Sequence, residues 1–341
     1  MTVHFFNIQM AFIALLSACT PLGADRKPVQ STAAPPVVQE VANDSPGLIT
    51  LKFDKEITAN AENFLIVPDT GIKTVECQGQ SVQIYPARDL DAGEEYFLKG
   101  TVQDSKNNST SFGVTFFGYN PDLPMLLINE FTTNGSGKHP DTVELYVTKG
   151  GNAAGITLFG GTKTTFADKF ILPQLNVEAG DYVLIHLKPQ GIDTEVDETE
   201  RKDMASGYDS SNTAWDFWVQ GGSGLSGNNG AVTLYTNPYG MLMDAVIYTN
   251  RTSESDANYR GFGSTRFMLQ AEEIAEEGGW VIAGDEITPE DCVWSADSTA
   301  TRSIGRSSTS EDTGSAADWH TVPTSKFSFG KGNSDEIYIR N

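Results

Sequence analysis

Motifs that identify common enzyme classes are absent from this chain of 341 residues. There is no GxSxG nucleophile elbow, no P-loop and no HExxH zinc motif, and the calcium-loop pattern DxDxDG is also missing. Each of these motifs places a nucleophile, a phosphate or a metal in a defined local geometry. Their absence favours a non-catalytic protein.

Cysteine and histidine are scarce, which argues against a zinc site or another metal centre. The three cysteines are Cys19, Cys77 and Cys292, without a CxxC pair, and the four histidines are scattered along the chain. Cys77 and Cys292 could form a disulfide in an oxidising compartment. Two separate buried thiols are the simpler expectation, because the two residues lie far apart in the sequence.

Positive charge is scarce as well. Lys and Arg total 23 against 45 Asp and Glu, which gives a formal net charge of −22, and the basic residues form no run. Such a chain repels nucleic-acid phosphates and anionic membrane surfaces, so we expect no nucleic-acid partner. The acidic excess is typical of a protein kept soluble at a crowded cell surface. Calcium binding by acidic loops is the alternative, and calcium is the one cofactor that the composition suggests.

Acidic residues are densest in two stretches, Glu195–Glu200 and Glu272–Glu277. A carboxylate pair that works as acid and base needs a partly buried site that separates the two pKa values. The density of charge here indicates solvated faces instead.

Glycine and aromatic residues are abundant, with 33 Gly, 18 Phe and 11 Tyr. This composition favours strands joined by turns over helices. The length is sufficient for two ordinary domains.

The first specific signal is an apolar leader. Residues 5–18 read FFNIQMAFIALLSA, and Cys19 follows. The apolar part is too short for a membrane span and has the length of a signal-peptide core. Leu16-Ser17-Ala18-Cys19 resembles the lipobox of bacterial lipoproteins, although no Lys or Arg precedes the cysteine, as is usual in signal peptides.

This resemblance implies that residues 1–18 are a lipoprotein signal peptide and that Cys19 becomes a lipid-bearing N-terminus. Anchoring is stable once two or more acyl chains are attached. Thr20 stands where an Asp would resemble an inner-membrane retention signal. We therefore expect a protein of the cell envelope, held in the outer membrane or at the cell surface by its lipid anchor.

Residues 19–44 are rich in Pro, Ala and small polar residues and show no periodicity. This composition predicts a flexible tether. Residues 45–120 then alternate with period two, for example at Ile49, Leu51 and Phe53, with turn signals between the runs. The pattern predicts a β-sandwich.

The same segment resembles the bacterial immunoglobulin-like domain of envelope proteins. Leu90, Gly93 and Tyr96 fill the family's "L-x-x-G-x-x-Y" corner. The resemblance implies a spacer or interaction domain, in which the Tyr96 hydroxyl is satisfied by nearby backbone. Asp104, Asn107 and Asn108 could ligate calcium, but a plain turn is the simpler interpretation.

Residues 125–341 resemble the lamin tail domain, another immunoglobulin-like fold. The opening strands match at Ile128-Asn129-Glu130-Phe131 and Val143-Glu144-Leu145-Tyr146. The closing segment matches at Ser303, Arg306, Asp318, Trp319, Ser328, Gly330 and Asn333. The predicted fold class is therefore all-β, with two immunoglobulin-like β-sandwiches in tandem.

The second unit is long for the lamin tail family, and two insertions near 189–228 and 250–298 account for the excess. The second insertion contains a partly amphipathic stretch, Arg266 to Glu277, which favours a short helix. Long loops on a rigid sandwich are where binding sites concentrate.

Aromatic residues lie in or beside these insertions, including Trp215, Trp218 and Trp280 together with Phe217 and Trp294. Trp215, Trp218 and Trp280 are candidates for a ligand-binding or glycan-binding platform. The alternative is that the aromatic rings cover the sandwich core beneath the loops.

Three charged residues of the opening and closing motifs are expected to stabilise the fold. Glu130 and Glu144 recur near strand ends, and Arg306 could pair with either of them. A buried pair of this kind would fix the fold rather than perform chemistry.

The sequence thus predicts a non-catalytic envelope lipoprotein that presents immunoglobulin-like domains to an unknown protein or glycan. One alternative is a purely structural envelope component with calcium-stiffened loops. Another is a secreted metal-dependent hydrolase or a nuclease-associated protein, because lamin tail domains accompany secreted nucleases and phosphatases.

Overall fold

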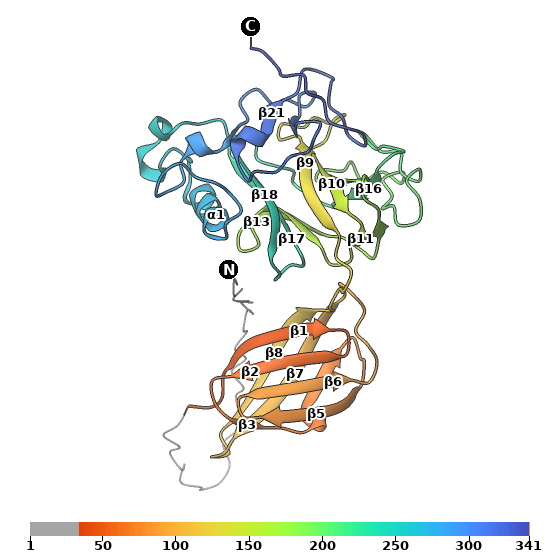
Figure 1. Cartoon of the computed structure of the whole chain (residues 1–341), viewed down its shortest axis with the longest axis vertical. Helices are drawn as coiled ribbons and strands as arrows, with labels where there is room; N and C mark the ends of the chain where they lie inside the picture. Colours follow the sequence, from red (N-terminus) through yellow and green to blue (C-terminus); the bar gives the residue numbers. More distant parts are fainter. Residues whose placement is uncertain (1–33, 341) are drawn as a thin grey trace. The chain divides into compact units, whose positions relative to one another are not determined.

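The computed structural model describes residues 34–340, and the chain divides into two compact units at Pro121 and Asp122. Each unit consists of stacked β-sheets (Figure 1). The predicted all-β sandwich class is confirmed. The expected signal peptide and Cys19 lie outside the described residues. Within residues 34–340, no helix is both long and apolar enough to cross a bilayer.

The first unit has two facing sheets. One has the order β1-β2-β6-β5, formed by β1 (Val38–Ser45), β2 (Leu48–Phe53), β6 (Ser81–Pro86) and β5 (Ile72–Gln78). The other is built on β7 (Glu95–Asp104), which pairs with β3 (Ile57–Thr58), β4 (Phe64–Val67) and β8 (Ser109–Phe117). The turn η1 (Ala61–Asn63) joins β3 to β4.

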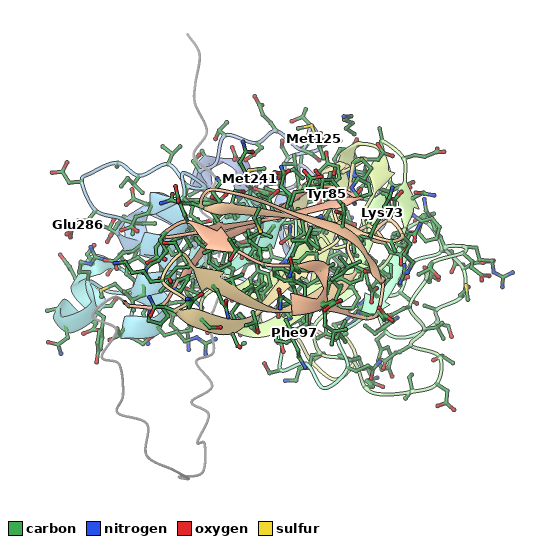
Figure 2. All side chains as sticks on the ribbon, turned by 90° about the horizontal axis from the view of Figure 1, so that it is seen from below. Lys73, Tyr85, Phe97, Met125, Met241 and Glu286 are labelled. Atoms are coloured by element: carbon green, nitrogen blue, oxygen red, sulfur yellow. The ribbon has the colours of Figure 1, made fainter. Side chains whose placement is uncertain are left out.

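Period-two alternation builds the core of this unit, because alternate side chains of a strand point to opposite faces. Ile49, Leu51 and Phe53 are buried, as the sequence predicts, and they pack in one cluster with Tyr96 and Leu98 of the other sheet. Each such side chain contributes about 1.5–3 kcal/mol on burial. Apolar side chains on the outer face, such as Phe97, are exposed (Figure 2).

The first strand begins at Val38, inside the stretch expected to be a tether. Val38 and Val41 are buried against the core of this unit, and β1 pairs antiparallel with β2. The expected start at residue 45 is therefore corrected: the folded part begins earlier because these two valines complete an apolar face.

Two predicted turns of this unit have satisfied polar groups. The Tyr96 hydroxyl accepts a hydrogen bond from the Asp91 amide at 3.0 Å, which confirms the corner interpretation. Asp104 Oδ1 accepts from the amides of Lys106 and Asn108 at 2.8 and 2.9 Å. The Asp104 carboxylate is thus used by its own turn.

The second unit contains a six-stranded and a five-stranded sheet. The six-stranded sheet has the order β16 (Trp215–Trp218), β15 (Tyr182–His186), β10 (Thr142–Lys149), β9 (Met125–Phe131), β20 (Ile304–Arg306) and β21 (Trp319–Thr321). The five-stranded sheet has the order β13 (Phe166–Ile171), β12 (Thr157–Gly161), β17 (Gly230–Tyr235), β18 (Leu242–Thr249) and β19 (Val293–Trp294). Strands β11 (Gly151–Asn152) and β14 (Asn176–Val177) form a separate pair.

The core lies between the two large sheets. Ile128, Leu145 and Ile185 of the six-stranded sheet belong to one buried cluster with Leu158 and Val246 of the five-stranded sheet. In β10, however, residues 142–145 are all buried, so the outer face of this strand is covered too. In a strand with one solvated face, buried and exposed residues would alternate instead. The outer face of the six-stranded sheet must therefore lie beneath other segments.

The predicted helix is present as α1 (Thr265–Glu276). Ser264 is its N-cap, and its side chain accepts a hydrogen bond from the Phe267 amide. Ala271 and Ile274 are buried in the core cluster of the second unit, so α1 covers part of the sandwich. Short turns flank the helix: η2 (Ser253–Ser255), η3 (Ala257–Tyr259) and η4 (Pro289–Asp291), with η5 (Ala316–Asp318) before β21.

The two expected insertions are in part sheet. The stretch 189–228 contains β16, which pairs parallel with β15 and extends the six-stranded sheet. The stretch 250–298 contains β19, which pairs parallel with β18. The sequence missed both strands because they are short and their partners lie more than thirty residues away along the chain.

Candidate functional site

The outer face of the six-stranded sheet concentrates the polar groups of the second unit. A β-bulge in β9 places one of these groups on the outer face. Leu145 pairs with Ile128 and Glu144 pairs with Glu130, so Asn129 is the extra residue of the bulge. The bulge keeps Ile128 in the core and turns Glu130 to the outer face beside Glu144. The expected "I-N-E-F" strand is thus present, with a bend that alternation alone does not predict.

The two glutamates hold the chain around residues 328–330 against this face. Ser328 donates from its amide to both Glu130 oxygens, at 3.0 and 2.9 Å, and from its hydroxyl to Oε2 at 2.6 Å. Ser303 also donates its hydroxyl to Glu130. The Gly330 amide donates to Glu144 Oε2 at 2.6 Å. Both carboxyl groups are fully buried.

Burial dominates the electrostatics of this pair. Burial, and next the charge of Glu130, raise the pKa of Glu144 well above its ordinary value. Burial also raises the pKa of Glu130, although hydrogen bonds from Ser303 and Ser328 oppose it. Burial and the like charge of a neighbouring carboxylate both disfavour the ionised form, so the protonated form of Glu144 is favoured relative to an exposed glutamate.

Two asparagines extend the hydrogen-bond network that Glu130 and Glu144 form with residues 328–330. The Asn129 amide donates to Glu144 Oε1 at 2.7 Å and to Asn333 Oδ1 at 2.8 Å. Asn333 in turn donates to Asn129 Oδ1 at 3.0 Å and to the Arg306 carbonyl at 3.1 Å. These side chains are buried. The closing-segment residues of the sequence motif therefore serve to bind the C-terminal segment onto the sheet.

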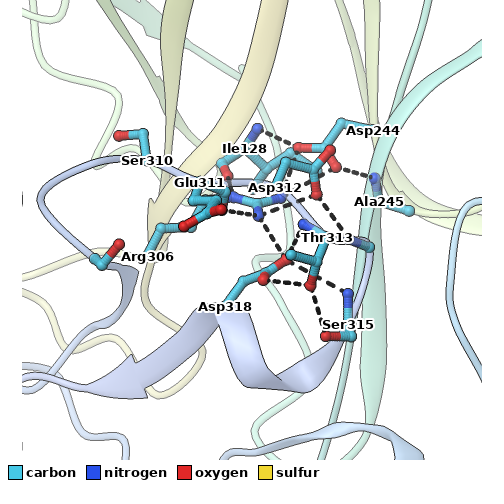
Figure 3. Close-up of polar contacts among 12 residues, drawn as sticks. Ile128, Asp244, Ala245, Arg306, Ser310, Glu311, Asp312, Thr313, Ser315 and Asp318 are labelled. Carbon is cyan, nitrogen blue, oxygen red and sulfur yellow. Dashed lines mark hydrogen bonds and ion pairs between the residues drawn. The ribbon is translucent and has the colours of Figure 1, made fainter.

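Arg306 lies at the centre of a second buried network (Figure 3). Its Nη2 lies 3.2 Å from both oxygens of Asp244, its Nη1 lies 3.1 Å from Asp318 Oδ2, and its Nε donates to the Ile128 carbonyl at 2.7 Å. Asp312 also pairs with Nη1. The expected pairing of Arg306 with Glu130 or Glu144 is wrong, because the guanidinium faces the other sheet.

Asp244 is held from three sides. The amides of Ile128 and Ala245 donate to it at 2.7 and 2.8 Å, in addition to Arg306. Burial nevertheless raises the pKa of Asp244 to about 7, against the lowering effect of Arg306. The Arg306 guanidinium lies over the Trp319 ring in cation–π geometry, with its Cζ 4.5 Å from the ring centroid.

A third polar group contains the residue types of a catalytic triad. Thr142, His186 and Trp218 are neighbours across three strands of the outer face. Thr142 Oγ1 lies 3.1 Å from His186 Nδ1, and Asp216 Oδ1 lies 2.6 Å from Nε2. The Trp218 ring stacks on the imidazole at 3.9 Å. Thr142, His186 and Asp216 are all 0% exposed, so a substrate has no access to them.

The segment 189–213 covers this histidine and is itself held by acidic residues. Glu198 accepts from the amides of Met204, Ala205 and Asp216 at 2.7, 2.8 and 2.9 Å. Glu195 accepts from the amides of residues 190–192. Both glutamates are buried. The expectation that the stretch Glu195–Glu200 is a solvated face is therefore corrected at these two positions.

The three candidate tryptophans are not brought together on an open surface. Trp218 is 1% exposed and donates from its indole to the Val196 carbonyl at 3.2 Å. Trp280 is buried and donates to the Asp291 carbonyl at 2.8 Å. Trp215 is half-buried beneath Lys202, whose Nζ lies 5.2 Å from the ring centroid. In place of an aromatic platform, the rings of Trp218 and Trp280 fill space under the loops.

The remaining cysteines are free thiols in different units. Cys292 is buried, as expected, and burial raises the pKa of its thiol. Cys77 is exposed, which corrects the expectation of two buried thiols.

One recess reaches the surface of the second unit. It has a volume of about 70 Å³ and lies between the first turns of α1 and the ends of β12 and β17. Four glycines contribute to its wall: Gly160, Gly161, Gly224 and Gly230. Arg266, Phe267 and Gln270 of α1 also line it, together with residues such as Leu225 and Tyr248.

Comparison with known proteins places the second unit in a family. Residues 124–321 match the family model TP_1001_2nd, described as "protein second domain". The chain belongs to this family. A relative from Treponema pallidum (strain Nichols), named only as an uncharacterized protein, is 27% identical over 218 residues. The match covers 63% of this chain and 54% of the relative, so the chain spans about half of that protein.

Two solved structures show a partial likeness. The N-terminal part of the bacterial S-layer protein SbsC has a TM-score of 0.26 and 16% identity, covering 45% of this chain and 40% of that one. Domains 1–6 of surface layer protein SbsC have a TM-score of 0.25 and 12% identity, covering 64% and 41%. A likeness at this level carries no argument about function.

Sequence reasoning missed several residues of these networks. Asp244 and Asp216 each stand inside a short apolar strand, in the stretches MDAVIY and WDFW. A charged residue in such a strand is costly unless it is paired, so both signalled a buried partner. Glu198 gave no such signal, because it lies among other acidic residues.

Proposed function

We propose that this chain is a non-catalytic lipoprotein of the cell envelope, anchored through Cys19, that presents its two sandwich units for binding to a protein or a glycan. The matches to the bacterial immunoglobulin-like and lamin tail patterns support this proposal at the level of motifs. The all-β sandwich architecture is compatible with both families.

The proposal that the protein is non-catalytic is supported by the structural role of the polar residues in the family motifs. Glu130, Glu144 and Arg306 are each 0% exposed. The two glutamates accept hydrogen bonds from Ser328 and Gly330 of the covering segment, and Arg306 donates to Glu311 and Asp318 of the segment before β21. General acid–base groups need contact with a substrate. Residues that hold loops in place leave the loops themselves as the surface for recognition.

The proposed location in the cell envelope depends on the apolar leader and on acylation of Cys19. Acylation of Cys19 is tested by metabolic labelling with a radioactive fatty acid in a bacterium that processes lipoproteins. We expect the wild-type chain to carry label and to sediment with membranes. Cys19→Ala should lose the label and appear in the soluble fraction. Cys77→Ala is the matched control, because it removes an exposed thiol and should keep the label.

Binding is tested with the detergent-solubilised full chain on glycan arrays and against envelope extracts. The proposal expects a saturable partner that survives high salt and contains protein or glycan. Hydrolysis of nucleic acid or phosphate esters in the presence of divalent metals, with no such partner, would contradict it.

A further inference from the structure

The chain contains two Asn-Gly steps, Asn134-Gly135 and Asn229-Gly230, and both lie in the second unit. A glycine has no Cβ, so its backbone nitrogen is open to the side chain of the residue before it. Attack of this nitrogen on the asparagine amide is an intramolecular reaction, in which the two groups are already held close together. The surroundings of each step therefore decide whether the reaction occurs.

The first step lies in the loop between β9 and β10, and its asparagine is weakly held. The Asn134 side chain is exposed. Its Nδ2 lies 3.4 Å from Thr133 Oγ1 and 3.4 Å from the Ser298 carbonyl oxygen. Both contacts are at the long end of the hydrogen-bond range. The side chain can therefore turn towards the Gly135 nitrogen at little cost.

A carboxylate stands beside the nitrogen that would attack. The Gly135 amide donates to Asp141 Oδ1 at 2.6 Å, which is the reach required of a general base. The Leu225 amide donates to the other oxygen of Asp141 at 2.9 Å and keeps the carboxylate in place. Burial raises the pKa of Asp141, so this group is a stronger base than an exposed aspartate.

The second step offers the opposite environment. Asn229 is 2% exposed, its Nδ2 donates to the Phe262 carbonyl, and its Oδ1 accepts from Thr249 Oγ1 at 2.9 Å. Gly230 lies in β17, paired with Tyr248 of β18. Ring closure at Asn229 would break both side-chain hydrogen bonds inside a buried region. The chain thus contains its own matched control.

We propose that Asn134 is a site of spontaneous deamidation, in which the Gly135 nitrogen attacks Asn134 Cγ and Asp141 receives the proton of that nitrogen. A new N–C bond closes a five-membered imide while the Cγ–Nδ2 bond breaks. The Nδ2 group leaves as ammonia and takes up the transferred proton. Water then opens either C–N bond of the imide, which leaves aspartate or isoaspartate. Water is the one co-reactant.

The product changes a contact between two loops. The Asn134 amide now donates towards the Ser298 carbonyl, and a carboxylate in its place would present a second acceptor to that oxygen. Two acceptors repel each other, so the loop of residues 295–303 should loosen. This inference goes beyond the proposed function, because the reaction requires neither a lipid anchor nor a binding partner.

The test is prolonged incubation of the detergent-solubilised full chain at neutral pH, followed by peptide mapping with mass spectrometry. In the native chain, Asn134 should convert at least tenfold faster than Asn229. In guanidinium chloride, the two sites should convert within threefold of each other, because both are Asn-Gly steps. Equal rates in the native chain would overturn the proposal. An intact Asn134 in the native chain, while the denatured chain converts, would do the same.

The dependence of the rate on pH tests the part assigned to Asp141. When hydroxide is the base, the rate rises tenfold per pH unit, and we expect this slope at Asn134 in the denatured chain. In the native chain the slope should be clearly smaller, because a neighbouring carboxylate replaces hydroxide. Equal slopes in the two states would overturn the role of Asp141.

Two variants test the effect on the loop. Asn134→Gln keeps the amide but requires a larger ring, so its conversion should be at least tenfold slower. Asn134→Asp copies one product. Amide hydrogen exchange at Thr299 and Arg302, which pair with each other in this loop, should be at least threefold faster in Asn134→Asp than in Asn134→Gln. Equal exchange in the two variants would contradict the predicted loosening.

Discussion

Arg306 and Asp244 join the two sheets of the second unit: Nη2 of Arg306, at the end of β20, lies 3.2 Å from both carboxylate oxygens of Asp244 in β18. Both side chains are buried. A buried ion pair is costly to desolvate and stabilises a fold only when its geometry and remaining hydrogen bonds are good. Here every nitrogen of the guanidinium has an acceptor, which fixes how one sheet lies over the other.

The first prediction concerns removal of this pair. Arg306→Met should lower the free energy of unfolding by about 3–5 kcal/mol, because the buried carboxylates of Asp244 and Asp318 lose the cation that compensates their charge. Urea unfolding followed by circular dichroism measures the loss. Combining Arg306→Met with Asp244→Leu should cost less than the sum of the single changes, with a coupling of about 0.5–3 kcal/mol.

The control for that experiment is the exposed pair Arg340–Asp297. Arg340→Met should cost less than about 1 kcal/mol, as surface pairs usually do. If Arg306→Met were as mild as Arg340→Met, the pair would not join the sheets as described.

The second prediction concerns pH. Glu144 and Asp244 have raised pKa values in the folded chain, the latter about 7, so the folded state holds protons that the unfolded chain has released. Their stabilising contribution is fully present below the unfolded values and is lost as pH rises through the folded values. The melting temperature should therefore fall as pH rises from about 5 to about 8.

A pair of variants separates this effect from general charge repulsion. Glu144→Gln removes the buried titration and should flatten the decline of melting temperature with pH. Glu276→Gln removes one charge from the exposed face of α1 and should leave the slope unchanged. Equal slopes in the two variants would rule out Glu144 as a source of the pH dependence.

The third prediction concerns the segment over His186. Glu198→Ala removes the acceptor of three amides, so residues 189–213 should become sensitive to proteases in the native chain. Limited proteolysis with mass spectrometry should find cuts in this segment at least tenfold faster than in wild type. The control variant Glu200→Ala changes an exposed neighbouring residue, and the protease should cleave it at the wild-type rate. Identical digestion of both variants would mean that Glu198 does not hold the segment.

The fourth prediction distinguishes the two thiols. Iodoacetamide at mildly alkaline pH should modify Cys77 in the native chain, because this side chain is exposed. Cys292 should react only after denaturation, since burial raises its pKa and removes access. Peptide mapping gives the two extents of modification. Native labelling of Cys292 would show that the core around β19 opens.

The sequence was sufficient where structure is local. Alternation at Ile49, Leu51 and Phe53 predicted the sheet face, and the spacing from Leu90 to Tyr96 predicted the corner. The helix α1 matched its predicted bounds within one residue at each end. Each of these features depends on neighbours a few residues apart, which a single sequence reveals.

Features that depend on distant partners could not be predicted in the same way. Arg306 was expected to pair within its own sheet, and its partner Asp244 lies in the other sheet, 62 residues earlier. Glu198 looked solvated because nothing local shows which segment will fold over it.

The central structural claim is that buried glutamates hold a covering segment rather than perform chemistry, and amide hydrogen exchange of residues 327–333 tests it most directly. In the wild-type chain, the Ser328 and Gly330 amides should exchange slowly, since both donate to buried carboxyl groups. Glu144→Ala should accelerate exchange at Gly330 at least tenfold while the strands of the first unit stay protected. Fast exchange at both amides in the wild-type chain, or no change in the variant, would contradict the account.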